Sequence, residues 1–389
     1  MRTKVVIIGG GPSGLLLGQH LNRAGIENII LERKTKPYVL NRIRAGVLEI
    51  GTVNQLRELG LGARMDKEGY MHDGTVISYN NEQTRIDFAK HTNTTVMIYG
   101  QTEITYDLYA GREADGAQVI YQVADVTIED ALTDAPYVEF TQAGQRARID
   151  CEYIAGCDGF HGASRQAIPR EARREYEKVY PFGWLGILSE TKPVHEELIY
   201  SNSDAGFALC SMRNENLSRY YIQCDAQDDP QAWSDRAFWD ELRNRIPEEF
   251  ADTIETGSVI EKSIAPLRSF VCEPMQWGRL FLCGDAAHIV PPTGAKGLNT
   301  AASDVFYLAD ALKQFYQHKD PQGINSYSAR ALSRIWKAER FSWWMTNLLH
   351  HFPNQSGFDH KMQMAEVSFL NSSDEAQAVL AQNYVGLPY

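Results

Sequence analysis

The first 32 residues contain the pattern that most restricts how this chain can fold. A short apolar run over residues 4–8, rich in β-branched side chains, is typical of a strand buried on both faces. Residues 15–24 have the composition of a helix, and the apolar run over residues 28–31 predicts a second strand that ends at Glu32. A strand, a turn, a helix and a second strand in this order form the opening unit of a parallel α/β sheet.

Three glycines occupy the turn between the first strand and the helix, with the spacing Gly9-x-Gly11-x-x-Gly14. Gly9 permits the tight turn, Gly11 lets a pyrophosphate approach the backbone, and Gly14 lets the helix pack closely on the strand. The free N–H groups and partial positive charge of a helix N terminus favour phosphate binding. Glu32, about 20 residues past the turn, is expected to accept a hydrogen bond from a ribose 2′-hydroxyl. We therefore expect a dinucleotide with a free 2′-hydroxyl to bind here.

A late segment distinguishes between NAD and FAD as that dinucleotide. The apolar run over residues 280–283 ends at Gly284-Asp285, and the stiff turn Pro291-Pro292-Thr293-Gly294 precedes a segment of helical composition. A carboxylate at the end of this strand suits the ribityl chain of a flavin, and N–H groups near Leu298-Asn299 could donate to the pyrimidine edge of its ring. Taken alone, the same residues fit an ordinary proline turn before a capped helix equally well.

A third segment in the middle of the chain has a similar form. Residues 151–157 predict another strand, which ends in Asp158-Gly159 and is followed by His161 and Ser164-Arg165. Together, the three motifs resemble those of the single-component flavoprotein aromatic hydroxylases, and the likeness runs nearly end to end. It is strongest toward the members that hydroxylate 4-hydroxybenzoate at C3, in ungapped blocks over residues 42–49, 99–103, 180–186, 263–270 and 383–389.

The resemblance implies a mixed α/β (α+β) fold that is assembled from separate segments. A Rossmann-like FAD-binding domain, discontinuous in sequence, is expected over residues 1–72, 97–180 and 268–320. A substrate-binding domain with a mixed, largely antiparallel sheet is expected over residues 73–96 and 181–267. Residues 321–389 are expected to form a C-terminal helical region, whose aromatic stripe suits core packing or a subunit interface.

The resemblance also implies which residues hold the cofactor. Tightly bound FAD is expected to contact the three glycines and a further set of residues: Ser13, Glu32, Arg42, Ile43, Arg44, Ala45, Gly46, Val47, Gln101, Asp285, Leu298 and Asn299. In this family, reduced flavin reacts with O₂ to give a C4a-hydroperoxide, whose distal oxygen is transferred to an ionised phenol.

A β-hairpin over residues 207–223 is predicted from the alternation of its side chains, with the turn at residues 214–217. Because side chains alternate along a strand, Ser211 and Arg213 are expected on one face, about 7 Å apart. An arginine and a hydroxyl on one face suit a carboxylate, and Tyr221 on the next strand could add a hydrogen bond. Without the family likeness, an ordinary hairpin with an exposed arginine is the better interpretation. With it, these three residues are the expected clamp for a benzoate carboxylate.

Hydroxylation of a benzoate ring requires that its para hydroxyl be ionised around neutral pH, away from bulk water. The resemblance brings Tyr200 and Tyr384 together as a proton relay that begins at this hydroxyl, with His72 at its outer end. It also places the carbonyl of Pro292 against the substrate hydroxyl. Most tyrosines are core residues with a satisfied hydroxyl, so these roles rest on the likeness.

The chain has no second GxGxxG motif, so the reductant NAD(P)H is expected to bind transiently in a surface cleft. Its expected contacts form a cationic track: Arg33, Lys34, Tyr38, Arg44, His161 and Arg268. Two basic residues beside a tyrosine suit an additional 2′-phosphate, which favours NADPH over NADH. A solvated basic turn is the alternative interpretation.

Composition disfavours several other classes of function. The formal net charge of −12 argues against nucleic acid and membrane surfaces as partners. The absence of HExxH and CxxC patterns predicts no metal site, and the six cysteines are expected to be reduced thiols of a cytoplasmic protein. No apolar stretch is long enough to span a membrane. A homodimer is what the family implies.

Two alternative functions are left open by the sequence. The chain could hydroxylate an isomer such as 2- or 3-hydroxybenzoate, or it could bind flavin without turnover as a sensor or assembly protein. The presence of Tyr200, Tyr384 and Arg213 argues against the second alternative. Thr300 stands where close relatives carry a bulkier apolar residue, and the sequence does not predict its effect beside the flavin.

Overall fold

The structure, a computed structural model, describes residues 1–41 and 46–389. One part of it is built on a six-stranded sheet with the order β18-β19-β12-β1-β2-β8. Its strands are β1 (Val5–Ile8), β2 (Asn28–Glu32), β8 (Val119–Tyr121), β12 (Tyr153–Gly156), β18 (Gln276–Trp277) and β19 (Leu280–Leu282). All neighbours pair in parallel except β18, which is antiparallel to β19. The three strands that precede the predicted motifs, β1, β12 and β19, therefore lie side by side with their carboxyl ends at one edge.

Helices and two small sheets complete this part of the molecule. Helix α1 (Pro12–Arg23) packs against both α6 (Gln101–Ala114) and α10 (Gly297–His318). The shorter helices are α2 (Lys36–Leu40), α3 (Ile50–Glu58), α4 (Ala63–Glu68) and α7 (Ala163–Gln166). One small sheet contains β9 (Val123–Glu129), β10 (Tyr137–Gln142) and β11 (Gln145–Asp150), and the other contains β3 (Val47–Leu48), β4 (Tyr70–His72) and β7 (Val96–Ile98). All four residues of β1 are buried, as expected of a central strand covered on both faces.

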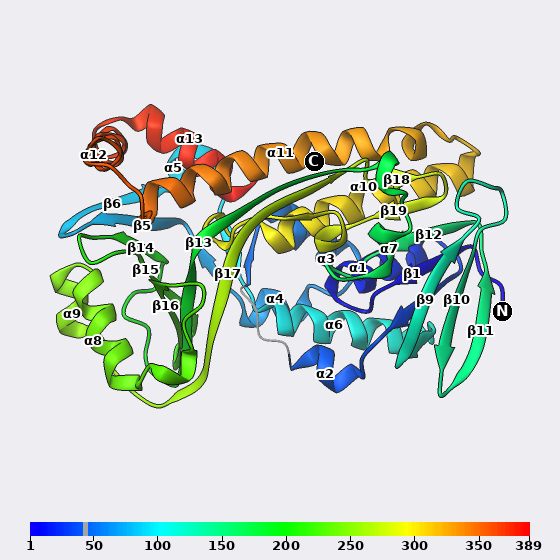
Figure 1. The fold of residues 1–389 in the computed structure, drawn as a ribbon, viewed down its shortest axis with the longest axis horizontal. Helices are drawn as coiled ribbons and strands as arrows, with labels where there is room; N and C mark the ends of the chain where they lie inside the picture. Colours follow the sequence, from blue (N-terminus) through cyan, green and yellow to red (C-terminus); the bar gives the residue numbers. More distant parts are fainter. Residues whose placement is uncertain (42–45) are drawn as a thin grey trace.

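The second part is a mixed sheet of eight strands with the order β20-β17-β13-β16-β15-β14-β5-β6. Its strands are β5 (Gly74–Tyr79), β6 (Glu82–Asp87), β13 (Arg174–Ser189), β14 (Ile199–Asn202), β15 (Ala208–Asn214), β16 (Leu217–Cys224), β17 (Val259–Glu273) and β20 (His288–Ile289). Strands β13 and β17 are long and run from this sheet toward the other part of the molecule (Figure 1). The domain boundaries expected at 180/181 and 267/268 fall inside these two continuous strands.

The two faces of the eight-stranded sheet pack against different helices. On one face, Cys210, Tyr220 and Ile222 share an apolar cluster with residues of α8 (Asp235–Arg245) and α9 (Glu248–Thr253). On the other face, Tyr200 and Leu209 share a cluster with residues of α5 (Phe88–Thr92), α12 (Gly357–Ser372) and α13 (Asp374–Val385). The alternation of strand side chains thus separates a structural face from the face that carries the predicted substrate residues.

Helix α11 (Gln322–Leu349) connects the two parts (Figure 1). Ile324, Tyr327 and Ile335 in its first half belong to the core around the six-stranded sheet. Met345 and Leu348 in its second half belong to the core beneath the eight-stranded sheet. A single helix therefore contributes side chains to the apolar cores of both sheets.

Two further features concern the environment of the protein. The six cysteines are all buried and free. Among residues 1–41 and 46–389, no helix combines the length and the apolar character needed to cross a lipid bilayer.

Candidate active site

The three glycines after β1 differ in what surrounds them. Gly9 has a φ of +109°, and a Cβ on it would overlap the backbone carbonyl of Cys157. A Cβ on Gly14 would overlap the carbonyl of Gly9, so close packing of α1 on the strand requires glycine. A Cβ on Gly11 would meet no other atom within 4 Å. Gly11 therefore borders open space at the N terminus of α1, where a phosphate could approach the backbone.

The turn after β19 packs directly onto the N terminus of α1. Gly284 has a φ of +61°, and its N–H donates to Asp304 Oδ2 at 2.8 Å. A Cβ on Gly284 would lie 2.9 Å from the Ser13 hydroxyl, so the first and third motifs are in contact. Asp285, the next residue, is exposed. The edge thus combines a helix N terminus without acidic residues in its first turn, a hydroxyl and an exposed carboxylate. This donor and acceptor set fits the pyrophosphate and the polyol chain of FAD.

Glu32 at the end of β2 is held in place by backbone groups. Its Oε2 accepts a hydrogen bond from the N–H of Gly10, and its Oε1 accepts one from the N–H of Lys34, both at 2.7 Å. Each carboxylate oxygen has a second lone pair. Glu32 is therefore oriented toward the glycine turn and keeps capacity for the hydroxyls of a ribose.

The first turn of α10 is tied to β3 and to the residue that follows it. Asn299 donates to the carbonyl of Val47 and accepts from the N–H of Glu49, each at 2.9 Å. The buried Thr300 hydroxyl donates to the carbonyl of Lys296 at 3.0 Å, so its polar group is satisfied within the helix. The side chain of Asn299 therefore positions this region, and it is the N–H groups of the first helical turn that could bind a ligand.

The other residues expected to contact FAD lie in three places. Gly46 is so close to Tyr99 that a Cβ would overlap the Tyr99 carbonyl. Leu298 and Gln101 are half-buried in the first turns of α10 and α6. The expected contacts Arg42, Ile43, Arg44 and Ala45 lie outside the described residues.

The middle motif stabilises its own turn. Asp158 Oδ2 accepts from both the N–H and the hydroxyl of Ser164, at 2.9 Å each, and so caps the start of α7. The Arg165 guanidinium that follows donates to the carbonyl of Phe160 at 2.8 Å and lies over its ring. This motif holds the loop after β12 in place beside the glycine turn.

The predicted substrate residues lie on one face of the eight-stranded sheet. Tyr200 of β14 pairs with Leu209 of β15, which pairs with Tyr221 of β16. The row continues to Gly186 of β13, where a Cβ would lie 2.6 Å from the Tyr221 ring. Directly paired residues share a face, so Tyr200 and Tyr221 stand two strands apart on the same side.

Ser211 is the next residue of β15 on this face, and Arg213 follows at an irregularity of the ladder. The register shifts between Met212 and Asn214, which places Arg213 at a β-bulge and changes the simple alternation expected there. Arg213 is half-buried, and its Nε atom is buried with no hydrogen-bond partner among the described residues. Burial lowers the pKa of Arg213, and the nearby Tyr221 opposes this effect. A half-buried guanidinium with a buried, unused Nε donor fits an incoming carboxylate.

Tyr200 and Tyr384, which are 184 residues apart in the chain, meet in the core below the clamp. Their hydroxyl oxygens are 2.9 Å apart, and both side chains are 1% exposed. Burial raises the pKa of both phenols above the ordinary value of 10. Both hydroxyls are therefore protonated near neutral pH, and either can donate to the other.

His72 at the end of β4 is not joined to this pair. It is buried, and neither of its ring nitrogens has a hydrogen-bond partner among the described residues. Burial lowers its pKa to about 4, so the imidazole is neutral near pH 7. The structure thus brings the two tyrosines together and leaves the predicted outer end of the relay unconnected.

Pro292 begins the short 3₁₀ turn η4 (Pro292–Gly294). Its carbonyl accepts the N–H of Ala295 at 2.9 Å, which leaves one lone pair for another donor. The Thr293 hydroxyl lies 2.9 Å from that of Thr346 on α11. The stiff turn is therefore fastened to the helix that joins the two parts of the molecule.

A buried charge cluster that the sequence did not predict lies beside the tyrosine pair. Lys296 Nζ donates to Glu49 Oε1 at 2.7 Å and to the carbonyl of Tyr384 at 2.6 Å. Arg334 Nη2 donates to Glu49 Oε2 at 2.6 Å, and its Nη1 donates to the carbonyl of Pro388 at 3.2 Å. The cluster holds the Tyr384 backbone and the C-terminal tail against the site. No local signal could reveal it, because Glu49 and Lys296 are 247 residues apart.

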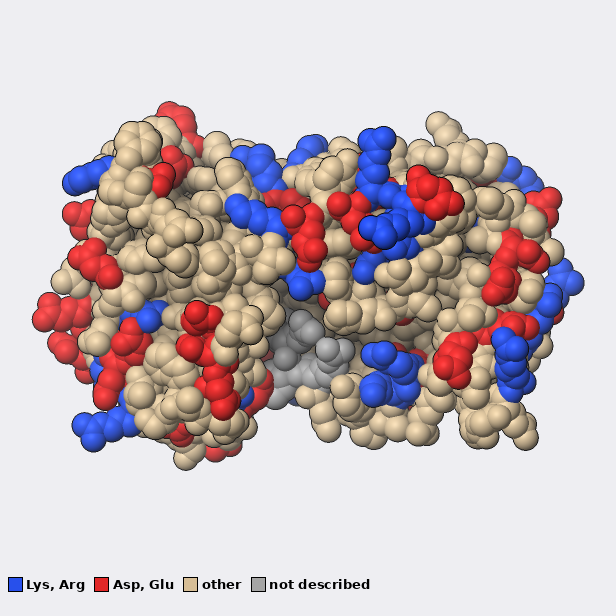
Figure 2. All heavy atoms as spheres, in the orientation of Figure 1, with Lys and Arg blue, Asp and Glu red and all other residues tan. Residues whose placement is uncertain are grey.

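The residues expected to bind NADPH form two groups in the structure. Arg33 and Lys34 are exposed just before α2, and the Lys34 ammonium lies 5.0 Å from the centre of the Tyr38 ring. Basic side chains gather near the position of α2 on the face shown in Figure 2. These residues thus lie just before and within a short helix.

The second group surrounds Phe160. The ring of His161 lies 5.0 Å from that of Phe160, and the Arg268 guanidinium lies 4.7 Å from the same ring. Arg268 also pairs with Glu177 at 3.2 Å. The sixth expected residue, Arg44, lies outside the described residues.

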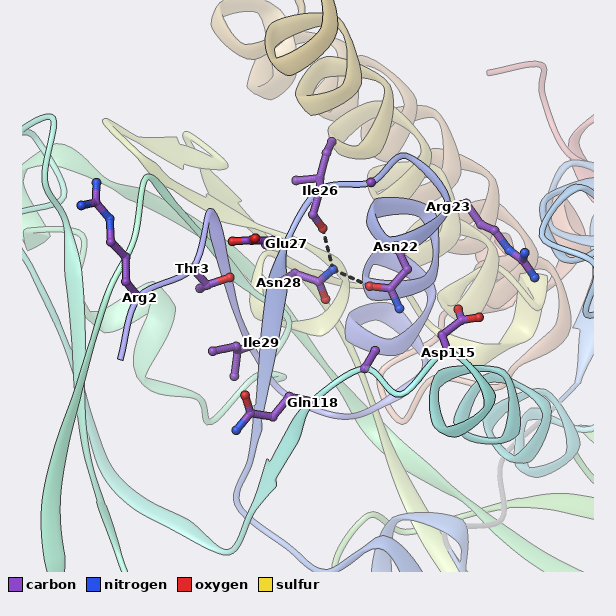
Figure 3. A pocket seen from close by; sticks show the side chains of 12 residues that line it. Arg2, Thr3, Asn22, Arg23, Ile26, Glu27, Asn28, Ile29, Asp115 and Gln118 are labelled. Atoms are coloured by element: carbon purple, nitrogen blue, oxygen red, sulfur yellow. Dashed lines mark hydrogen bonds between the residues drawn. The ribbon is translucent and has the colours of Figure 1, made fainter.

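A polar groove elsewhere on the surface is separate from this site (Figure 3). It lies at the amino ends of β1 and β2, opposite the edge that carries the glycine turns. Its lining includes Arg2, Thr3, Asn22, Asn28 and Gln118. Ligands of parallel sheets bind at the carboxyl ends of the strands, so the groove is not the cofactor site.

The fold and the three turns at the carboxyl edge define a flavoprotein. The chain belongs to the FAD-binding domain family, whose model matches residues 2–342. The chain is 53% identical to the p-hydroxybenzoate hydroxylase of Acinetobacter baylyi. The alignment covers 100% of this chain and 96% of that protein. This chain is also 24% identical to the 6-hydroxy-3-succinoylpyridine 3-monooxygenase of Pseudomonas putida, over 81% of this chain and 80% of that protein.

Solved structures of more distant proteins share the fold. The p-nitrophenol 4-monooxygenase of Pseudomonas putida has a TM-score of 0.83 at 17% identity and covers 100% of both chains. The anhydrotetracycline hydroxylase of Streptomyces rimosus has a TM-score of 0.76 at 21% identity, over 99% of this chain and 76% of that chain.

Proposed function

We propose that this chain is a FAD-dependent monooxygenase that uses NADPH and O₂ to hydroxylate 4-hydroxybenzoate at C3, giving 3,4-dihydroxybenzoate. The observation that carries the proposal is the placement of Tyr200 and Tyr221 on one face of the sheet, two strands apart. Two strand spacings correspond to about 10 Å. A ring with a carboxylate at one end and a hydroxyl at the other can span this separation.

The same geometry favours the para isomer over the two alternatives. With its carboxylate held by Arg213, a 4-hydroxybenzoate ring directs its hydroxyl toward Tyr200. In the 2- and 3-isomers, the hydroxyl is directed to the side of this line and does not reach the tyrosine pair. The position of the hydroxyl therefore decides whether the relay can act on the substrate.

Bound FAD supplies the chemistry that activates O₂ for transfer to a ring carbon. The residues of the chain prepare the ring for this step. Arg213, Ser211 and Tyr221 bind and orient the carboxylate by hydrogen bonds. The substrate hydroxyl passes its proton to the Tyr200 oxygen, the Tyr200 proton moves to Tyr384, and Tyr384 in turn gives up its own hydroxyl proton to water at the outer end of the relay. The negative charge left on the phenolate raises electron density at the adjacent carbon, which is C3.

The electrostatics of the site support a relay of neutral tyrosines. Because burial raises the pKa of Tyr200 and Tyr384, neither is a stable anion, and each can accept a proton only while it donates its own. The positive charges of Lys296 and Arg334 exceed the charge of Glu49, and they favour negative charge nearby.

Three further proposals concern the assembly and its surroundings. The exposed Lys34 and Tyr38 beside Arg33 support NADPH as the reductant, because two cations suit its 2′-phosphate. The exposed rings of Trp336 and Trp343 on α11 support a homodimer. The buried, free cysteines support a reducing, cytoplasmic environment.

Turnover with the three isomeric hydroxybenzoates tests the proposed function. Purified FAD-loaded protein with NADPH and O₂ should convert 4-hydroxybenzoate to 3,4-dihydroxybenzoate, identified by chromatography and mass. The 2- and 3-isomers should give no dihydroxylated product above background. NADH should support lower kcat/KM than NADPH. An equal yield from another isomer, or no product from any of them, would contradict the proposal.

A further inference from the structure

His350, at the end of α11, lies inside a stack of aromatic rings beneath the substrate sheet. Its side chain is 0% exposed. Its ring is stacked on Phe182 at 4.7 Å between centres and on Phe207 at 4.2 Å, and it lies nearly parallel to Trp184 at 5.8 Å. The histidine therefore occupies the apolar core between α11 and the face that carries the substrate residues.

Both nitrogens of this imidazole have partners. The Trp184 indole N–H donates to Nε2 at 2.7 Å, so Nε2 must be the unprotonated nitrogen. Nδ1 lies 3.0 Å from the carbonyl of Thr346, to which it donates in the same tautomer. A single neutral tautomer satisfies both bonds, and burial lowers the pKa of His350 to about 3. The ring is therefore a fixed hydrogen-bond acceptor for Trp184 rather than a proton carrier.

The next residue, His351, is also held by hydrogen bonds from the sheet. Trp184 of β13 pairs in register with Gln223 of β16. Gln223 donates to the carbonyl of His351 at 2.6 Å and accepts from its N–H at 3.1 Å. Two paired side chains of the sheet thus hold two consecutive residues at the end of α11.

The next row of the sheet carries the clamp. Trp184 and Gly186 lie two residues apart on one face of β13, and Gly186 pairs with Tyr221. The Tyr221 ring lies 5.2 Å from the Trp184 ring and directly over Gly186, where a Cβ would lie 2.6 Å from it. The position of the Trp184 ring therefore limits where Tyr221 can place its hydroxyl.

We propose that His350 is a positioning residue for the substrate. It fixes the Trp184 ring, Trp184 holds Tyr221 in the clamp, and the end of α11 is thereby set relative to the bound carboxylate. This inference rests on the proposed function, because it assigns a role to a residue behind the same substrate site.

A His350→Phe variant tests the proposal in the FAD-loaded enzyme. Phenylalanine keeps the stacked ring and removes the acceptor, which leaves the Trp184 N–H buried without its partner. We expect KM and Kd for 4-hydroxybenzoate to rise about tenfold. We expect kcat at saturation and the Kd of FAD to change by less than about twofold, because neither the relay nor the cofactor edge is touched. His350→Gln, whose Oε1 can accept from the indole, should restore KM to within about threefold of wild type.

Trp344→Phe is the matched control. Trp344 also lies on α11 and donates its indole N–H to Glu366 at 3.2 Å, away from the clamp. This variant should keep the wild-type KM. A wild-type KM in His350→Phe, or a KM raised equally by Trp344→Phe, would overturn the proposal. If His350→Phe does not fold, His350→Asn withdraws the same acceptor, and an unchanged KM there would also overturn it.

The outcome separates this inference from the proposed function. If the wild-type protein does not hydroxylate 4-hydroxybenzoate, both the proposed function and the positioning role of His350 are wrong. If the wild-type protein turns over normally and the His350 variants keep their substrate affinity, only the positioning role is wrong.

Discussion

At the scale of single residues, Arg213 is the side chain on which we expect substrate affinity to depend most. It stands at a β-bulge with a buried Nε that lacks a partner among the described residues. A bulge redirects a side chain out of the regular alternation, and bulges are frequent beside active sites. We expect an incoming carboxylate to satisfy the unused donor, so that binding offsets the cost of burying it.

Arg213→Ala should leave the protein folded and yellow, since the cofactor edge is formed by other strands. Its affinity for 4-hydroxybenzoate should fall by about 2–5 kcal/mol, the usual effect of removing one partner of a buried charge pair. Arg213→Lys should also bind poorly, because an ammonium cannot donate two parallel hydrogen bonds. Titration of flavin absorbance with substrate measures both. Wild-type affinity in Arg213→Ala would show that the clamp is assigned wrongly.

At the scale of elements, the glycine turn separates folding from cofactor binding. Gly11 and Gly14 belong to the same motif, yet a Cβ on Gly11 meets open space whereas one on Gly14 overlaps the backbone carbonyl of Gly9. Gly11 has a φ of −78°, which any residue adopts. We therefore expect Gly11 to be required for ligand binding, whereas Gly14 is required by the contact between helix and strand.

Gly11→Ala should fold with wild-type stability and bind FAD at least tenfold more weakly, because the methyl group occupies the path of the pyrophosphate. Gly14→Ala should lower the free energy of unfolding by about 1–3 kcal/mol, since a backbone overlap is relieved only by moving α1. Urea unfolding of the apoproteins and fluorescence titration with FAD distinguish the two effects. Equal stability losses in both variants would contradict this assignment.

Local sequence patterns predicted the strands around the cofactor edge. They did not predict which distant residues pair with one another. The strands before Gly9, Asp158 and Gly284 were predicted from short apolar runs, and the structure places them side by side. The long strands β13 and β17 cross the expected domain boundaries, because a sheet strand can extend through two cores without a change in its pattern.

Contacts between residues far apart in the sequence could be identified only from the folded structure. The sequence contains no signal that joins Glu49 to Lys296 or Trp184 to His350, which are 247 and 166 residues apart. The bulge at Arg213 also depends on the partner strand. The pairing of Tyr200 with Tyr384 was expected only from the family likeness.

At the scale of the whole molecule, buried ionisable groups make stability depend on pH. Burial lowers the pKa of His20 to about 4, of His72 to about 4 and of His350 to about 3, below the unfolded value of 6.5. The unfolded chain therefore binds more protons at these sites, and stability is lost as pH falls from 6.5 toward 4. Burial raises the pKa of Glu339 to about 7, which acts in the opposite direction between pH 7 and 4.5.

These four groups together predict that unfolding at pH 5 takes up about two protons, so stability should fall by about 3 kcal/mol per pH unit there. Urea unfolding between pH 4.5 and 7 measures the slope. His72→Gln should reduce the proton uptake on unfolding by about one proton. A flat profile across this range would contradict the buried, neutral state of the histidines.

Ionisation of the bound phenol is the role that we propose for Tyr200 and Tyr384. Tyr200→Phe removes one hydroxyl of the 2.9 Å pair and keeps the ring that packs the core. Substrate should still bind, because the carboxylate clamp is intact, and NADPH and O₂ should still be consumed. Without the relay, the ring is not activated, and the reducing equivalents should appear as hydrogen peroxide.

The direct test is the ratio of 3,4-dihydroxybenzoate formed to NADPH consumed, measured with peroxide in the same reaction. Wild type should approach one product per NADPH, whereas Tyr200→Phe and Tyr384→Phe should fall to a small fraction, with peroxide making up the difference. If either variant converts nearly every NADPH into dihydroxybenzoate at the wild-type rate, the tyrosine pair does not carry the proton.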